Sequence, residues 1–160
     1  MTDMADIRFT LNGREVAYNG GAADRLLEAL RDTYRCTSVK CGCKEGECGA
    51  CAVLIDGVLY NSCCVAMGAV EGASVVTMEG YRETERFAAL EKAFGELSAV
   101  QCGFCIPGMV LAAEALLSKN AHPTEDEIRE GLSGNLCRCT GYNAIVNAVA
   151  NAAKEGSGLW

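Results

Sequence analysis

Residues 43–51 read Cys-Lys-Glu-Gly-Glu-Cys-Gly-Ala-Cys, and this loop constrains the fold more than any other stretch of the chain. Three cysteines and two glycines in so short a segment suit neither a strand nor a helix, because glycine loses the most backbone freedom on ordering. The spacing C-x4-C-x2-C is typical of the loop that holds a plant-type [2Fe-2S] cluster. The sequence therefore predicts an iron–sulfur centre here, held by Cys43, Cys48 and Cys51, with Cys63 as the fourth ligand.

The cysteine content and the charge narrow the class of protein. The chain has 160 residues and 11 cysteines, and it does not open with the charged and apolar pattern of a secretory signal. We expect a cytoplasmic protein, since in a reducing compartment cysteine pairs usually hold metal or carry out redox chemistry. The net charge of −7 argues against nucleic acid or an anionic membrane surface as a partner. No apolar run is long enough to predict a membrane span.

The first part of the chain carries strand patterns around one helix. Asn12-Gly13 and Asp56-Gly57 are tight-turn signals that predict two hairpins. A helix of about three turns is expected from Asp24, whose side chain can cap it. Together these features predict a compact α+β unit that ends near residue 78. Its expected strands are residues 7–11, 16–18, 52–55, 58–60 and 74–78.

Beyond Glu79-Gly80 the strand pattern stops, and we expect a linker at roughly residues 79–84. The remainder reads as four helices with short connections, which indicates a bundle. The domain prediction is thus residues 1–80 and residues 81–160. The four helices are expected around residues 87–97, from Pro107 through Leu117, from a capping box at Thr124 and Glu127 through Leu132, and from Tyr142 to Lys154.

Two further cysteine pairs fall in the bends of the predicted bundle. Cys102 and Cys105 precede its second helix, and Cys137 and Cys139 precede its fourth. Approximate two-fold packing of the two helical halves would bring the pairs together, and helix N-termini favour a negatively charged group such as a thiolate-bound cluster. On spacing alone these pairs could also hold zinc or form a thiol redox motif. Beside a ferredoxin loop, they predict a second iron–sulfur centre.

Three motifs, taken together and in order, resemble the small iron–sulfur subunit of the molybdenum hydroxylases. This is the xanthine dehydrogenase/aldehyde oxidoreductase family, which includes bacterial carbon monoxide, nicotinate, isoquinoline and 4-hydroxybenzoyl-CoA enzymes. The resemblance covers nearly the whole chain. The motifs are the cysteine loop 43–51 with Asp56-Gly57 and Ser62-Cys63, Gln101-Cys-Gly-Phe-Cys-Ile-Pro-Gly108, and Gly134-Asn-Leu-Cys-Arg-Cys-Thr-Gly-Tyr142.

The resemblance implies an α+β protein with an N-terminal β-grasp ferredoxin-like domain and a C-terminal four-helix-bundle domain, each with one [2Fe-2S] cluster. It further implies a large partner subunit carrying molybdopterin in its cytosine dinucleotide form and a medium subunit carrying FAD, assembled as a dimer of heterotrimers. By resemblance, Gln101 and Cys139 approach the pterin, and Cys139 is also an iron ligand. The metal ligands implied overall are Cys43, Cys48, Cys51, Cys63, Cys102, Cys105, Cys137 and Cys139.

The function implied is electron transfer within an oxidoreductase. Electrons would pass from the molybdopterin centre through the bundle cluster and then the ferredoxin-like cluster to FAD or another acceptor. The substrate would be a purine, an N-heteroaromatic or an aldehyde-type compound hydroxylated with oxygen from water. No catalytic residue and no substrate site are expected on this chain, because nothing in it resembles a nucleophile–base pair or a catalytic carboxylate.

Some residues depart from the family pattern, and other functions stay open. Ile106 stands where the family generally has threonine or serine, so the contacts near the bundle cluster are expected to differ. Cys36, Cys41 and Cys64 lie outside the ligand pattern and are expected to be small buried hydrophobes, although Cys41 and Cys64 adjoin ligands and could replace them. The alternative functions are a stand-alone two-cluster electron carrier and a zinc-stabilised interaction module.

Overall fold

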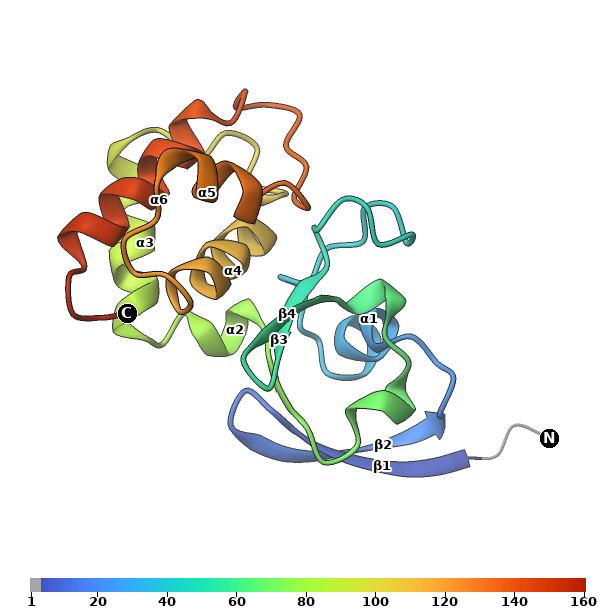
Figure 1. The fold of residues 1–160 in the computed structure, drawn as a ribbon. Helices are drawn as coiled ribbons and strands as arrows, with labels where there is room; N and C mark the ends of the chain where they lie inside the picture. Colours follow the sequence, from blue (N-terminus) through green and yellow to red (C-terminus); the bar gives the residue numbers. More distant parts are fainter. Residues whose placement is uncertain (1–3) are drawn as a thin grey trace.

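The computed structural model describes residues 4–160, with the sheet and the long helices on opposite sides of the molecule (Figure 1). Within these described residues the sheet has five strands in the order β2-β1-β5-β3-β4, and β1 and β5 form its one parallel pair. The α+β prediction is confirmed. The strands are β1 (Met4–Leu11), β2 (Arg14–Gly21), β3 (Ala52–Ile55), β4 (Val58–Asn61) and β5 (Ser74–Val76).

Both hairpin turns form where they were predicted. Asn12 and Gly13 have positive φ angles of 50° and 79°, as a two-residue turn between twisted strands requires. Ile7, Phe9 and Leu11 face inward from β1 and are buried, while Arg8 between them is exposed. This alternation packs one face of the sheet against the helical segment that follows β2.

That helical segment differs from its prediction. It consists of α1 (Leu26–Glu28) and a π-helix (Ala29–Thr33), and the residue at its N-cap position, Arg25, makes no side-chain cap. Asp24 does not cap it, because its carboxylate accepts hydrogen bonds from the Gly21 N–H at 2.8 Å and the Tyr18 hydroxyl at 2.7 Å. The carboxylate thus turns back to the first hairpin, where it raises the pKa of Tyr18 to about 12.

The junction between the halves is ordered and partly helical. The strand expected over residues 74–78 ends at Val76, and α2 (Met78–Tyr81) occupies part of the expected linker. Glu79 on α2 accepts hydrogen bonds from both the N–H and the hydroxyl of Ser38, at 2.8 and 2.5 Å. Buried Thr77 exchanges hydrogen bonds with the Asn12 side chain. The junction is therefore fastened to the sheet-containing half.

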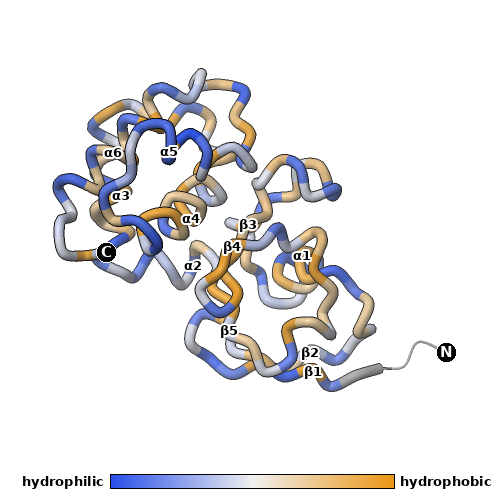
Figure 2. The backbone as a smooth tube through the Cα atoms, viewed as in Figure 1, coloured by the Kyte–Doolittle hydropathy of each residue, from blue (hydrophilic) through white to orange (hydrophobic). Residues whose placement is uncertain are grey.

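The four predicted helices of the second half are present. The side chains of Thr84 and Thr124 cap α3 and α5, and Glu127 completes the predicted capping box of α5. Figure 2 shows α4 as largely hydrophobic, in agreement with its burial among the other helices. No helix within residues 4–160 is long and apolar enough to cross a membrane. The helices are α3 (Glu85–Glu96), α4 (Ile106–Leu117), α5 (Glu125–Gly131) and α6 (Asn143–Glu155).

Buried side chains form two clusters. One lies between the sheet and the segment after β2, and the other lies among the four helices and takes in Leu54 of β3. The division into residues 1–80 and 81–160 stays a prediction.

Candidate iron–sulfur centres

The first candidate centre lies at the end of the β3–β4 hairpin. Cys51 directly precedes β3, and Cys63 lies in the 3₁₀ turn that directly follows β4. Because Ala52 pairs with Asn61 across the hairpin, these two cysteines are brought to the same end of it. Their thiols interact, and both residues are buried. The other two predicted ligands, Cys43 and Cys48, also have interacting side chains and are half-buried.

Backbone groups of the loop are directed at sulfur. The Glu45 N–H donates to Cys43 Sγ at 3.4 Å, and Gly46 adopts the positive φ of 82° that the bend requires. Hydrogen bonds from the backbone of Glu45 and Cys48 lower the pKa of Cys43 to about 7. Burial, with the neighbouring Cys51 thiol, raises the pKa of Cys63. A lowered pKa favours the thiolate, which is the form that binds metal.

The second candidate centre gathers the four cysteines of the bundle. Cys139 Sγ lies 3.6 Å from Cys102 Sγ, although the residues are 37 positions apart. The thiols of Cys105 and Cys137 interact in the same way. The expected convergence of the two pairs is therefore present. Cys105 is buried at the start of α4, whereas Cys102 and Cys139 are exposed.

The two inner cysteines of this centre have opposite pKa shifts. Burial, with the adjacent Cys137 thiol, raises the pKa of Cys105 to about 12. Burial alone would also raise the pKa of Cys137, but hydrogen bonds from Thr140 and Cys139 overcome it and lower that pKa to about 7. The Thr140 hydroxyl donates to Cys137 Sγ at 3.1 Å. The Cys137 N–H donates to the Tyr142 hydroxyl at 2.9 Å, which fixes the loop beside its cysteine.

The pairing of the thiols tests whether the residues fit the cluster. A [2Fe-2S] cluster has two irons, each needing two thiolates, so its ligands should come as two pairs rather than one tetrahedral set. Within residues 4–160, no three side chains of Cys, His, Asp or Glu gather as they would around one metal ion. Both centres instead have the two-pair arrangement and fit the cluster. The pairs are Cys43 with Cys48, Cys51 with Cys63, Cys102 with Cys139, and Cys105 with Cys137.

The two centres are joined through the backbone. The Leu136 N–H donates to the Cys48 carbonyl oxygen at 3.0 Å, and Leu136 is covalently followed by Cys137. The Asn135 amide donates to the neighbouring Gly49 carbonyl oxygen at 3.1 Å. Figure 1 shows the two loops approaching each other between the sheet and the helices. Sequence periodicity carries no signal for such a contact between loops 86 positions apart, so the contact could not be predicted from the sequence.

The remaining site predictions have mixed outcomes. Cys36 is buried, with its sulfur 3.8 Å from the Tyr34 carbonyl oxygen. Cys41 and Cys64 are exposed, so the expectation that they are buried hydrophobes is wrong. Cys64 Sγ lies 3.7 Å from Cys63 Sγ on the outer side of the 3₁₀ turn. Ile106 packs against the helical core. The threonine or serine that the family generally has at this position would make fewer apolar contacts there.

The outer surface of the bundle centre is partly apolar. Gln101, beside the exposed Cys102, is exposed, and so are Phe104 and Leu136, at 47% and 56%. Large apolar side chains grouped at a surface mark a contact region.

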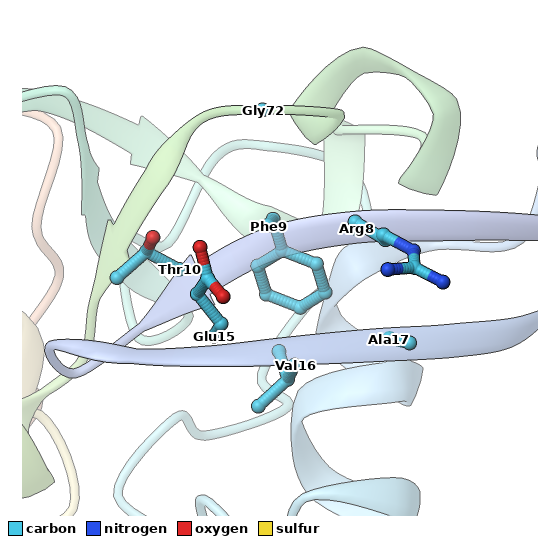
Figure 3. Close-up of a pocket in the computed structure, with 7 residues that line it drawn as sticks. All are labelled: Arg8, Phe9, Thr10, Glu15, Val16, Ala17 and Gly72. Atoms are coloured by element: carbon cyan, nitrogen blue, oxygen red, sulfur yellow. The ribbon is translucent and has the colours of Figure 1, made fainter.

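The hollow shown in Figure 3 lies away from both candidate centres, along β1 and β2, and has a volume of about 490 Å³. Arg8, Glu15 and Gly72 are on its walls, and no cysteine lines it.

Comparison with known proteins agrees with this geometry. Residues 9–73 match the model of a 2Fe-2S iron–sulfur cluster binding domain, and residues 77–150 match that of a [2Fe-2S] binding domain. The nicotinate dehydrogenase small FeS subunit of Eubacterium barkeri is 46% identical over 149 residues, covering 93% of this chain and 95% of that protein. This chain belongs to the small iron–sulfur subunits of the molybdenum hydroxylase family.

Other relatives of this small subunit agree. The xanthine dehydrogenase iron–sulfur-binding subunit of Escherichia coli O157:H7 is 43% identical and covers 92% of this chain and 94% of its own. In the crystal structure of quinoline 2-oxidoreductase from Pseudomonas putida 86, one chain is 41% identical in sequence to this chain and matches its fold with a TM-score of 0.86. The match covers 96% of this chain and 98% of that chain. The ferredoxin-like and helical [2Fe-2S] fold of the small subunit is thereby confirmed, as is its place in an oxidoreductase.

Proposed function

We propose that this chain is the electron-transfer subunit of a heteromeric molybdenum hydroxylase, receiving electrons at its helical half and releasing them from its ferredoxin-like half. The observation that carries the proposal is the hydrogen bond from the Leu136 N–H to the Cys48 carbonyl at 3.0 Å. Cys48 belongs to the first candidate centre, and Leu136 precedes Cys137 of the second. One hydrogen bond and a few covalent bonds thus connect the two ligand sets.

The ligands we propose are the eight cysteines that form the four thiol pairs. When bound, a [2Fe-2S] cluster takes up and gives back a single electron, at a potential set by hydrogen bonds to its sulfurs and by solvent exposure. This chain supplies both controls. The Glu45 N–H and the Thr140 hydroxyl donate to cysteine sulfurs, and burial differs between exposed Cys102 and buried Cys105. The ligands are Cys43, Cys48, Cys51 and Cys63 for the first centre, and Cys102, Cys105, Cys137 and Cys139 for the second.

The exposed side of the helical centre is the entry that we propose for electrons. Cys102 and Cys139 reach the surface there, beside exposed Gln101. Phe104 supplies apolar contact area next to them. This surface fits a large subunit that carries molybdopterin, with Gln101 and Cys139 approaching the pterin. The ferredoxin-like centre then faces FAD on a medium subunit or another acceptor, within a dimer of heterotrimers.

The names of the relatives, and not any residue of this chain, support the substrate class that we propose. Their names refer to nicotinate, xanthine and quinoline, all of which contain nitrogen in an aromatic ring system. We propose an N-heteroaromatic or purine substrate, hydroxylated on the large subunit with oxygen from water. The small subunit supports this reaction by positioning its cysteines and by excluding water from Cys51, Cys63 and Cys105.

Affinity purification tests the proposal. A tag on this chain, expressed with its neighbouring genes, should retain two larger chains together with molybdenum, flavin and two clusters per small subunit. A soluble monomer that several unrelated enzymes reduce would instead identify a stand-alone electron carrier. A colourless product loaded with zinc would remove the redox function, because iron and acid-labile sulfide would both be missing.

A further inference from the structure

The two cysteine loops meet at a tightly packed contact centred on Asn135. This side chain is 4% exposed. Its amide Nδ2 donates to the Gly49 carbonyl oxygen at 3.1 Å, and the adjacent Leu136 N–H donates to the Cys48 carbonyl oxygen at 3.0 Å. Two consecutive carbonyl groups of the ferredoxin loop are therefore held by two consecutive residues of the helical loop.

Two glycines leave the space that Asn135 needs. Gly49 has a φ of 66°, and a Cβ there would lie 2.4 Å from Asn135 Nδ2. A Cβ on Gly108, in α4, would lie 2.3 Å from the Gly49 carbonyl oxygen and 3.2 Å from Asn135 Nδ2. Side chains at either position would push the loops apart. The contact thus depends on three residues from three segments fitting without spare room.

Each side of this contact is fixed within its own half. The Gly49 carbonyl also accepts a hydrogen bond from the Ala52 N–H at 3.1 Å, at the start of β3. The Asn135 N–H donates to the carbonyl of Leu132, which is buried in the helical core at the end of α5. Asn135 therefore connects a rigid strand end to a rigid helix end, rather than two loose loops.

We propose that Asn135 is a positioning residue for electron transfer between the two centres, an inference that rests on the proposed function. Its amide holds the Cys48–Gly49 segment against Leu136 and so sets the separation of the two ligand sets. Among residues 4–160, the hydrogen bonds that Asn135 donates go to the Gly49 and Leu132 carbonyls and to no cysteine sulfur, so its loss should leave ligation intact. What should change is the interaction between the centres, not either centre alone.

The test uses the full chain with both clusters, reduced and studied by low-temperature electron paramagnetic resonance. The readout is the magnetic splitting that each reduced cluster causes in the signal of the other. Asn135→Asp keeps the shape of the side chain but replaces the donor with a carboxylate that faces the Gly49 carbonyl. Gly108→Ala opens the same contact from α4 with Asn135 unchanged. Asn147→Asp, at an exposed position of α6, makes the same chemical change away from the contact.

We expect the splitting to be present in the wild type and in Asn147→Asp. In Asn135→Asp and Gly108→Ala it should be lost or markedly reduced, while the iron content, the sulfide content and the integrated spin stay unchanged. Wild-type splitting in Asn135→Asp and Gly108→Ala would overturn the inference. Loss of a cluster in both variants would also overturn the inference, because changing a positioning residue should leave ligation intact. A wild-type chain that holds two clusters but shows no splitting would overturn it as well. A wild-type chain that binds fewer than two clusters would instead refute the proposed function.

Discussion

Cys102 and Cys139 bring their sulfur atoms to within 3.6 Å from loops that precede two different helices, α4 and α6. Neither loop can form this arrangement alone, so the four cysteines form one site only within the folded bundle. The inner pair, Cys105 and Cys137, lies on the buried side of the same arrangement. The helical half therefore presents a site with one exposed thiol pair and one pair made of buried Cys105 and half-buried Cys137.

Neighbouring cysteines allow a matched test of the ligand set. We expect Cys43→Ser and Cys63→Ser to lose the ferredoxin-like cluster, because each removes one of two thiolates from an iron. Cys41→Ser and Cys64→Ser, which change exposed thiols outside the pairs, should retain it. Iron and sulfide per chain are the measurement. Equal losses in Cys63→Ser and Cys64→Ser would contradict the assignment of the fourth ligand.

Thr140 is expected to tune the potential of the helical cluster. Its hydroxyl donates to Cys137 Sγ at 3.1 Å while accepting from the Tyr142 N–H at 3.3 Å. A donor to sulfur stabilises the more negative, reduced state, so Thr140→Val should lower the midpoint potential of this cluster. Thr140→Ser should keep the wild-type value. The measurement is a redox titration followed by electron paramagnetic resonance. The same titration reports the ferredoxin-like cluster, whose midpoint potential should not change. An unchanged midpoint potential of the helical cluster in Thr140→Val would refute this role of Thr140.

Glu114 organises the polar interior of the helical half. It is 5% exposed, and its carboxylate accepts hydrogen bonds from Tyr81, Arg86, Ser118 and Trp160 at 2.6 to 2.8 Å. Removing the carboxylate leaves these donors without their acceptor, so Glu114→Ala should lower the free energy of unfolding by on the order of 3 kcal/mol.

The control for Glu114 is Glu91→Ala, which removes an exposed carboxylate from α3. It should change the free energy of unfolding by less than about 0.5 kcal/mol. Urea unfolding of both variants gives the comparison. Similar small losses in the two would show that the Glu114 network does not stabilise the fold.

Stability should depend on pH through Glu79. Partial burial would raise its pKa, but hydrogen bonds from Ser38 and Thr77 outweigh burial and lower the pKa. A carboxyl group with a depressed pKa stabilises the folded state above its unfolded pKa of about 4.3, and this contribution is lost as the pH falls through the folded value. The urea midpoint of unfolding should therefore be higher for the wild type than for Glu79→Gln at pH 7. The gap between the two midpoints should narrow below about pH 4.3. A gap that widens on acidification would contradict the sign.

Local sequence patterns predicted much of the fold because the relevant contacts are local. The Asn12-Gly13 turn and the Thr124 capping box depend on residues within four positions of each other. The helix from Asp24 was predicted less well, since its carboxylate bonds to Tyr18 and Gly21 instead of the following helix. No helical periodicity distinguishes a π-helix turn such as Ala29–Thr33 from an α-helix.

The candidate ligands were also visible in the sequence, because loop spacing and family motifs both mark them. What the sequence did not indicate is how the two centres meet. The contact of Asn135 with Gly49 depends on the packing of two finished halves, and on the absence of a side chain at Gly108. Such a fit has no periodic signature and appears only once the tertiary arrangement is known.

Eight cysteine thiolates are proposed to form two separate [2Fe-2S] centres in this one chain. The most direct measurement is electron paramagnetic resonance of the fully reduced complex as isolated, with the signals integrated against a spin standard. We expect two distinguishable iron–sulfur species that together integrate to two spins per small subunit. A single species integrating to one spin would contradict it.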